Sequence, residues 1–269
     1  MDRNDNLDYI LHRLMADNGR RFALPTSLVE KQRMMRALMN VREPIPASDD
    51  FLKAQDAELQ QQAEDKGIVK ILKDGRMEEW ESSIFHFSNF SILLWQGDIT
   101  RLKVDAIVNA ANAQGLGCWA PLHNCIDNCI HSAAGIQLRQ ECYDQLQSRL
   151  LKTGEAIMTR GYNLPAHHVI HTVGPIIETD LPSREQEEQL AQCYHSCLDL
   201  AEQHHLLSIA FCCISTGVFH FPNKRAADIA LATVKAWHSA HPSSSINQVV
   251  FNVFLDKDYD IYRRLLTTN

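Results

Sequence analysis

The sequence predicts an α/β fold in which a mixed, largely buried sheet lies between layers of helices. From about residue 91 to the end of the chain, short apolar runs alternate with segments of helical periodicity. Strands that alternate with helices in this way are typical of a sheet covered on both faces. The chain has 269 residues, of which 45% are hydrophobic, so it can bury a core of the size that such a fold needs.

The N-terminal part, residues 1–85, is expected to be a helical extension. A first helix is predicted by apolar residues at helical spacing, namely Leu7, Ile10, Leu11 and Leu14. Ser27 and Glu30 are spaced as a capping box at the start of a second helix. A third helix runs from Ser48 to Gly67, and its polar, glutamine-rich sequence suggests a cover rather than a core element.

Residues 86–269 are expected to form the α/β domain. Strands are predicted over 91–96, 104–110, 155–159, 168–172, 208–214 and 248–255. Helices are predicted over 124–146, 183–205 and 223–240, and a short helix ends the chain. Ligands of such folds bind at the carboxyl ends of the strands, so the chemistry is expected on the loops that follow them.

Charge and composition exclude some classes of protein. The formal net charge is -7, whereas proteins that grip a nucleic-acid backbone are usually basic. No apolar run approaches the length of roughly 18 residues that spans a bilayer. Eight cysteines, with no apolar signal-peptide core at the start, favour free or metal-bound thiols in a reducing compartment. We therefore expect a cytoplasmic protein with no nucleic-acid or membrane partner.

Two loops offer polar groups to a ligand. Gly97-Asp98-Ile99-Thr100 follows a predicted strand, and its carboxylate can accept a hydrogen bond from an exocyclic amine such as that of adenine. The alternative is an aspartate that caps a turn. In the stretch VNAANAQGLG, Asn109 and Asn112 offer donors and acceptors, while Gly115 and Gly117 let backbone amides approach a ligand. The alternative there is an ordinary Asn/Gly turn.

A third loop has the donors of a metal site. Cys118, His123 and Cys125 fall within eight residues, just before a helix. Two thiolates and one imidazole would balance the charge of Zn²⁺ and leave one tetrahedral position open, as in catalytic rather than structural zinc sites. The alternative is two buried thiols and an unrelated histidine. Cys129 or His131 as a fourth ligand would instead make a closed, structural site.

The fourth loop, Ile214 to Pro222, precedes a helix and suits a phosphate. Glycine and small hydroxyl residues before a helix N-terminus leave N–H groups free to bind an anion. Phe219 and Phe221 would wall a sugar, or else are two core aromatics in a turn.

Taken together, the ordered set GDIT, VNAAN and ISTGVFHFP resembles the macrodomain, a three-layer α/β/α fold that binds ADP-ribose. The resemblance covers residues 85–267. The stretch GCWAPLHNCIDNCIH is similar to the zinc-dependent branch of microbial macrodomains, which also carries an N-terminal helical extension. Trp119 stands where that branch usually has Phe, and His220 stands where ordinary macrodomains usually have Gly.

The resemblance implies a role for each loop. Cys118, His123 and Cys125 would bind zinc, with His123 and Cys125 thereby part of the catalytic site. Asp98 and the Ile99 amide would read adenine, and Asn109 and Asn112 would face the distal ribose. Further contacts to ADP-ribose would come from the backbone around Gly117 and Cys118 and from the diphosphate-binding residues Ser215, Thr216, Gly217, Val218, Phe219, His220 and Phe221.

The function that this resemblance implies is removal of mono-ADP-ribose from modified proteins, in some relatives beside a sirtuin-like ADP-ribosyltransferase. Zinc would either activate a water or orient the distal ribose. Asn112 would position the sugar, and Asp127 would act as a general base, support a neighbouring group or only cap its helix. The rival interpretations are a reader that binds ADP-ribose without cleaving it, an O-acetyl-ADP-ribose deacetylase and a structural zinc protein.

Overall fold

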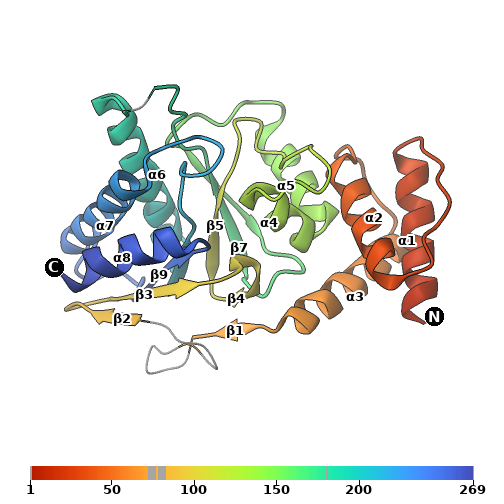
Figure 1. The fold of residues 1–269 in the computed structure, drawn as a ribbon, viewed down its shortest axis with the longest axis horizontal. Helices are drawn as coiled ribbons and strands as arrows, with labels where there is room; N and C mark the ends of the chain where they lie inside the picture. Colours follow the sequence, from red (N-terminus) through yellow and green to blue (C-terminus); the bar gives the residue numbers. More distant parts are fainter. Residues whose placement is uncertain (1, 72–76, 78–82, 180, 269) are drawn as a thin grey trace.

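The computed structural model describes residues 2–71, 77, 83–179 and 181–268, and its centre is one mixed sheet (Figure 1). Seven strands of the described chain lie in the order β2-β3-β9-β8-β5-β7-β6. In that order their bounds are Ser83–His86, Ser91–Gln96, Gln248–Val253, Ser208–Phe211, Ala106–Ala110, His168–Thr172 and Ala156–Arg160. The five inner strands are parallel, and the edge strands β2 and β6 are antiparallel to their neighbours. The carboxyl ends of the five parallel strands therefore meet at one edge.

Helices cover both faces of this sheet, which confirms the three-layer α/β/α architecture. On one side lie α4 (Ile126–Ala134) and α5 (Ile136–Leu146). On the other lie α6 (Arg184–Gln203), α7 (Asn223–Ala240) and α8 (Asp256–Thr267) (Figure 1). The core between them contains large, fully buried aromatic residues: Trp95, Tyr194, Phe211, Trp237 and Phe251. Within the described ranges, no helix combines the length and the apolar character needed to cross a membrane.

The single helix predicted over 124–146 is wrong, because Gly135 divides it into α4 and α5. Gly135 adopts a φ of +103°, which an L-residue rarely adopts and which ends the first helix. Gln55 of the third helix then accepts a hydrogen bond from the Ile136 N–H at 3.0 Å. A contact from 81 residues away thus satisfies the N–H group that the break releases.

Two predicted strands are too long at their carboxyl ends. The strand predicted over 208–214 ends at Phe211, and the one predicted over 248–255 ends at Val253. Phe254 and Leu255 are 73% and 56% exposed, so they belong to the loop at the carboxyl edge. Apolar sequence alone does not distinguish these residues from the buried strand before them.

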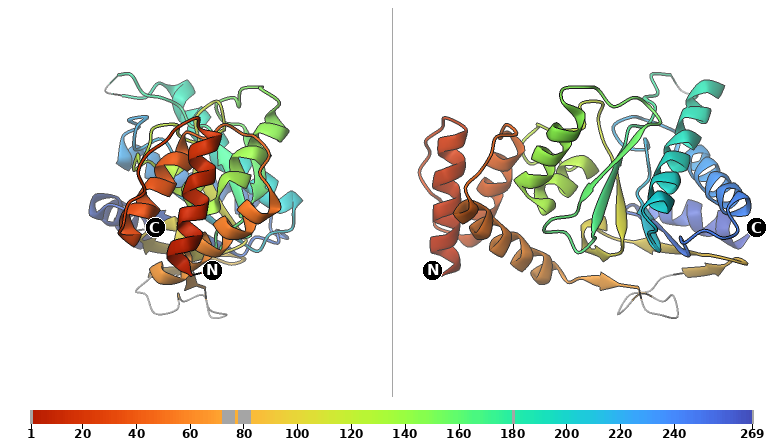
Figure 2. Two further views of the ribbon diagram at one scale, coloured as in Figure 1. Left: turned by 90° about the vertical axis from the view of Figure 1, so that its right-hand side faces the viewer. Right: turned by 180° about the vertical axis from the view of Figure 1, so that it is seen from behind.

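The N-terminal extension consists of α1 (Arg3–Asp17), α2 (Leu28–Asn40) and α3 (Asp49–Lys66). Its helices share a hydrophobic cluster that includes Leu7, Leu11, Met35 and Phe51. They pack on the α4 side of the molecule, far from the C-terminus (Figures 1 and 2). After α3, β1 (Val69–Lys70) pairs in parallel with β4 (Leu102–Lys103). The expected boundary between residues 85 and 86 falls inside β2.

Ser27 begins α2 as predicted, although the contact is half of a capping box. Its hydroxyl accepts from the Glu30 N–H at 3.3 Å, and the two side chains bond to each other at 2.9 Å. The complete capping box of the described chain is instead formed by Ser183 and Gln186 at the start of α6.

Candidate functional site

The carboxyl edge of the sheet gathers three of the four sequence loops, since each follows a parallel strand. Asp98 follows β3, Asn112 follows β5, and residues 215–221 follow β8. The fourth loop, which we name the Cys–His–Cys loop (residues 118–125), leads from the second of these into α4. The tertiary fold thus brings segments more than 100 residues apart to one end of the molecule.

Asp98 caps the 3₁₀ helix η1 (Ile99–Arg101), as the turn interpretation predicts. Its Oδ1 accepts from the Thr100 N–H at 3.0 Å and from the Thr100 hydroxyl at 2.7 Å. Its Oδ2 lies 3.5 Å from Nζ of Lys66, the last residue of α3. Ile99 is buried, so its side chain is not available to a ligand.

Asn112 and Asp127 lie together, whereas Asn109 lies behind them. Asn109 is wholly buried on β5, and its amide donates to Asp127 Oδ1 at 2.8 Å. Asn112 is partly exposed and donates to Asp127 Oδ2 at 3.2 Å and to the Gly117 carbonyl at 3.1 Å. Asp127 is not the cap of α4, because Cys125 occupies that position. The Asp127 carboxylate therefore orients the Asn112 amide at the edge of the sheet.

Burial sets the protonation of this network. It raises the pKa of Asp127 to about 6, although the hydrogen bonds from Asn109 and Asn112 lower it in part. Burial lowers the pKa of His171 to about 3, so this imidazole is neutral at physiological pH. Its Nδ1 lies 3.1 Å from the Asn109 amide nitrogen, and its Nε2 lies 3.0 Å from the Thr159 hydroxyl.

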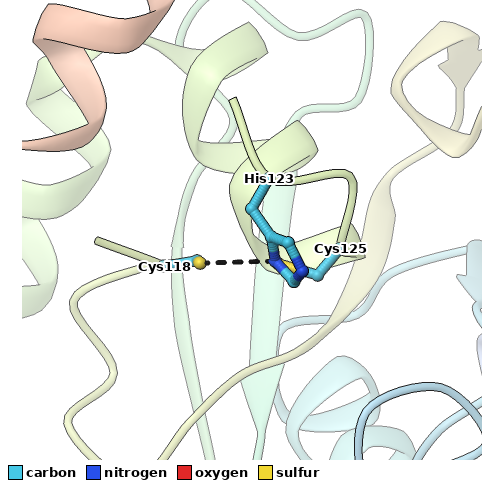
Figure 3. Close-up of side chains that lie close together, drawn as sticks. All are labelled: Cys118, His123 and Cys125. Carbon is cyan, nitrogen blue, oxygen red and sulfur yellow. Dashed lines mark hydrogen bonds between the residues drawn. The ribbon is translucent and has the colours of Figure 1, made fainter. Parts of the chain in front are cut away.

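The Cys–His–Cys loop brings its three donor atoms together (Figure 3). The donor atoms of Cys118, His123 and Cys125 all lie within 4.8 Å of one another. Cys118 Sγ is 3.6 Å from His123 Nδ1. Zinc bonds of about 2.3 Å to sulfur and about 2.05 Å to nitrogen at a tetrahedral angle place those two donors about 3.6 Å apart. The residues present therefore fit zinc in both chemistry and spacing.

The neighbours of this loop bear on the type of metal site. Burial, followed by the charge and hydrogen bonding of Cys118, raises the pKa of Cys125 to about 12, so a nearby cation is needed to hold Cys125 as a thiolate at neutral pH. Neither Cys129 nor His131 belongs to the three-residue group. His131 lies instead in a buried group with Cys142 and His171, and burial holds its pKa well below the ordinary value. Among the described residues, the group in the Cys–His–Cys loop therefore has three protein donors and takes no fourth from Cys129 or His131.

Residues 215–221 form a tight loop with backbone amides to offer. Ser215 has a φ of +64°, and its carbonyl accepts from the Phe221 N–H at 2.9 Å. The N–H groups of Gly217, Val218 and Phe219 have no acceptor within the described part of the chain. Successive free amides before a helix form a nest for an anion. Phe221 itself is buried in the core, His220 is exposed, and Phe219 packs partly against Leu146, Leu151 and Val173.

Sequence reasoning missed several residues at this edge. Phe254 and Ile176 are 73% and 53% exposed on loops that follow β9 and β7, where apolar surface suits a ligand. The signal was an apolar residue in the loop after a buried strand: Phe254 directly follows β9, and Ile176 lies four residues after the end of β7. Arg36 and Asn40 of α2 contact the Cys–His–Cys loop, and nothing in their local sequence indicates it.

Comparisons with known proteins agree with this architecture. The Macro domain family matches residues 108–230. A protein-ADP-ribose hydrolase of Staphylococcus aureus (strain MSSA476) is 45% identical over 262 residues, covering 96% of this chain and 93% of that protein. A protein of the same description from Treponema medium is 46% identical, covering 91% and 90%. A probable bifunctional ADP-ribose hydrolase/ADP-ribosyltransferase of Fusarium oxysporum f. sp. cubense is 42% identical, and the match covers 40% of it.

Solved structures show the same fold. The Oceanobacillus iheyensis macrodomain with ADP has a TM-score of 0.63 and 36% identity, covering 70% of this chain and 96% of that one. The Trypanosoma brucei macrodomain in complex with ADP-ribose has a TM-score of 0.57 and 38% identity, covering 65% and 68%. The match to the Staphylococcus protein spans almost the whole chain and so includes most of the N-terminal helices as well. The sheet order, the loops at its carboxyl edge and these similarities together show that the chain belongs to the macrodomain family.

Proposed function

We propose that this chain is a zinc-dependent hydrolase that removes mono-ADP-ribose from modified protein side chains. The observation that carries the proposal is the convergence of Cys118, His123 and Cys125 beside Asn112 at the carboxyl edge of the sheet. Relatives that are 45% and 46% identical are described as protein-ADP-ribose hydrolases, and solved macrodomains hold ADP or ADP-ribose. A three-donor site supports hydrolysis over reading, because a reader needs no Lewis acid.

The loops divide the ligand between them. The free amides of residues 217–219 would bind the diphosphate, and the partly exposed carboxylate of Asp98 would accept from the adenine amine. Asn112 would bind a hydroxyl of the distal ribose, since Asp127 holds its amide in place. The buried Asn109 would act through Asp127 and not by direct contact.

Hydrolysis breaks the bond between the anomeric carbon of the distal ribose and the side-chain atom of the modified protein. The oxygen of a water forms the new bond to that carbon, and the released side chain takes a proton. Zinc held by Cys118, His123 and Cys125 would supply a Lewis acid with one position open to an oxygen ligand. The chain itself orients the sugar through Asn112 and holds the diphosphate through residues 217–219.

The partner that supplies the modified protein would be an ADP-ribosyltransferase, and we propose a sirtuin-like one. The Fusarium relative supports a functional pairing of this kind, because its description joins hydrolase and transferase in one chain.

The test is release of ADP-ribose from a mono-ADP-ribosylated protein, with zinc content measured on the same sample before and after chelation. Release that follows about one zinc per chain supports the proposal. Cys125→Ala should lose zinc and turnover, whereas Cys129→Ala, one helical turn further along, should keep both. Tight binding of ADP-ribose without release would make the chain a reader, and preferential release of acetate from O-acetyl-ADP-ribose would make it a deacetylase.

A further inference from the structure

The conformation of the Cys–His–Cys loop depends on contacts from other parts of the chain. All eight of its residues lie outside helices and strands. Leu122, which immediately precedes the proposed ligand His123, has a φ of +59°, a left-handed conformation that leucine seldom adopts. Such a conformation persists only where surrounding contacts impose it. The contacts that do so come largely from the N-terminal extension.

Arg36 of α2 holds the loop at two places. Its Nη2 donates to the His123 carbonyl at 2.9 Å, directly on the backbone of the imidazole ligand. The same guanidinium donates to Asn128 Oδ1 at 2.8 and 3.2 Å. The Asn128 amide in turn donates to the Ala120 carbonyl at 3.0 Å. One side chain of the extension thus fixes both the middle and the end of the loop.

Asn40, at the end of α2, holds the strained residue. Its Oδ1 accepts from the Leu122 N–H at 3.0 Å, and its Nδ2 donates to the Ser132 hydroxyl of α4 at 2.9 Å. The side chain of Asn40 is only 2% exposed, so it has no freedom to release Leu122. The left-handed conformation of Leu122 is therefore imposed from 82 residues away in the sequence.

Arg139 of α5 joins the end of α2 to the start of the same loop. It donates to the Arg42 carbonyl at 2.6 Å and to the Leu116 carbonyl at 2.7 Å. Its guanidinium carbon lies 4.0 Å from the centre of the Trp119 ring. A shift of α2 would therefore displace the start of the loop through Arg139 and the end of the loop through Arg36.

We propose that the N-terminal extension is a positioning element of the metal site, with Arg36 and Asn40 holding the Cys–His–Cys loop so that its donor atoms converge before a metal binds. This inference rests on the proposed function, which assigns zinc to that loop. A loop that must become ordered when it binds a metal loses part of the binding free energy to conformational entropy. Partners outside the ligand set typically change metal affinity by about 10- to 100-fold.

The experiment measures Zn²⁺ affinity of the full chain by competition with a chromophoric chelator, a readout that needs no turnover. Arg36→Ala and Asn40→Ala should each weaken zinc binding by about 10- to 100-fold. Their affinity for free ADP-ribose should change much less, because neither residue contacts residues 215–221 or Asn112. The loss of turnover in these two variants should be smaller at saturating zinc than at limiting zinc, because added zinc offsets weaker binding.

Lys31→Ala is the matched control. Lys31 lies on α2, five residues before Arg36, and its buried ammonium pairs with Asp8 at 2.7 Å inside the extension. This variant should lose stability but keep the zinc affinity of the wild type. Equal zinc affinities in wild type, Arg36→Ala and Asn40→Ala, or an equal loss in Lys31→Ala, would overturn the positioning role alone. A wild-type chain that binds no zinc would overturn the proposed function together with it.

Discussion

The buried histidine behind the proposed site offers the sharpest test of the network around Asp127. The Asn109 amide nitrogen must be a donor, because it also bonds the Asp127 carboxylate. His171 Nδ1 must therefore accept from it, and Nε2 carries the proton toward the Thr159 hydroxyl. A second proton on His171 would place a donor against a donor. The network thus requires a neutral His171.

The magnitude follows from the pKa of His171, which burial lowers from 6.5 to about 3. Below pH 6.5 the unfolded chain binds a proton at this histidine and the folded chain does not, so acid favours unfolding. Between about pH 7.5 and about pH 5, this histidine alone should remove about 2 kcal/mol from the free energy of unfolding. The stabilisation is present above pH 6.5 and is lost as the pH falls toward 3.

The perturbation is His171→Gln, which keeps an acceptor for Asn109 and a donor for Thr159 but cannot titrate. Urea unfolding followed by tryptophan fluorescence at both pH values should show a fall about 2 kcal/mol smaller in this variant than in the wild type. His131 contributes in the same direction in both proteins, and most of its contribution cancels because burial, and not His171, is the largest cause of its lowered pKa. An equal fall in the two proteins would refute the reasoning.

His238→Gln separates stability from activity. Burial and the nearby His241 lower the pKa of His238 to about 4. The His238 ring stacks on Phe90 with 3.7 Å between the ring centroids, far from the loops at the carboxyl edge of the sheet. This variant should also reduce the acid sensitivity of folding but leave ADP-ribose release at neutral pH unchanged. His171→Gln should alter release as well, because it touches the residue that holds Asp127.

Three further predictions concern the loops. Gly174→Ala would place a Cβ 1.9 Å from Ser215 Oγ, so the loop of residues 215–221 should shift. The ADP-ribose affinity measured by calorimetry should then fall by at least about tenfold, or about 1.4 kcal/mol, and an unchanged affinity would contradict a role of this loop in binding the ligand. Arg139→Met leaves the Leu116 carbonyl without its donor and should lower the free energy of unfolding by about 3 kcal/mol in urea. Asn112→Ala should lower the single-turnover rate by about 100-fold with little change in stability, whereas an unaltered rate would remove Asn112 from the reaction.

Features that depend on neighbours in the sequence were predictable. The alternation of apolar strands and helices predicted the α/β class, because burial on both faces leaves a local pattern. The Cys–His–Cys spacing predicted a cluster of donors, because a short loop can turn back and bring all three together, and the structure brings these donors within 4.8 Å of one another. The role of the cluster as a zinc site stays a prediction.

Features that depend on distant contacts were not predictable from local pattern. The break at Gly135 needs Gln55 to accept a hydrogen bond from the freed Ile136 N–H. The sequence also predicted that Asn109 faces the ligand. Only the packing of β5 against α4 and β7 shows that Asn109 is buried between Asp127 and His171.

The sequence by itself determined the family, the order of the loops at the carboxyl edge and the cluster of Cys118, His123 and Cys125, since each is a property of residues close together in the chain. Tertiary structure alone decided how those loops are held. Arg36 and Asn40 reach the Cys–His–Cys loop from more than 80 residues away, and His171 reaches Asn109 across 62. Such contacts depend on which faces of helices and strands pack together, and a one-dimensional pattern does not contain that information.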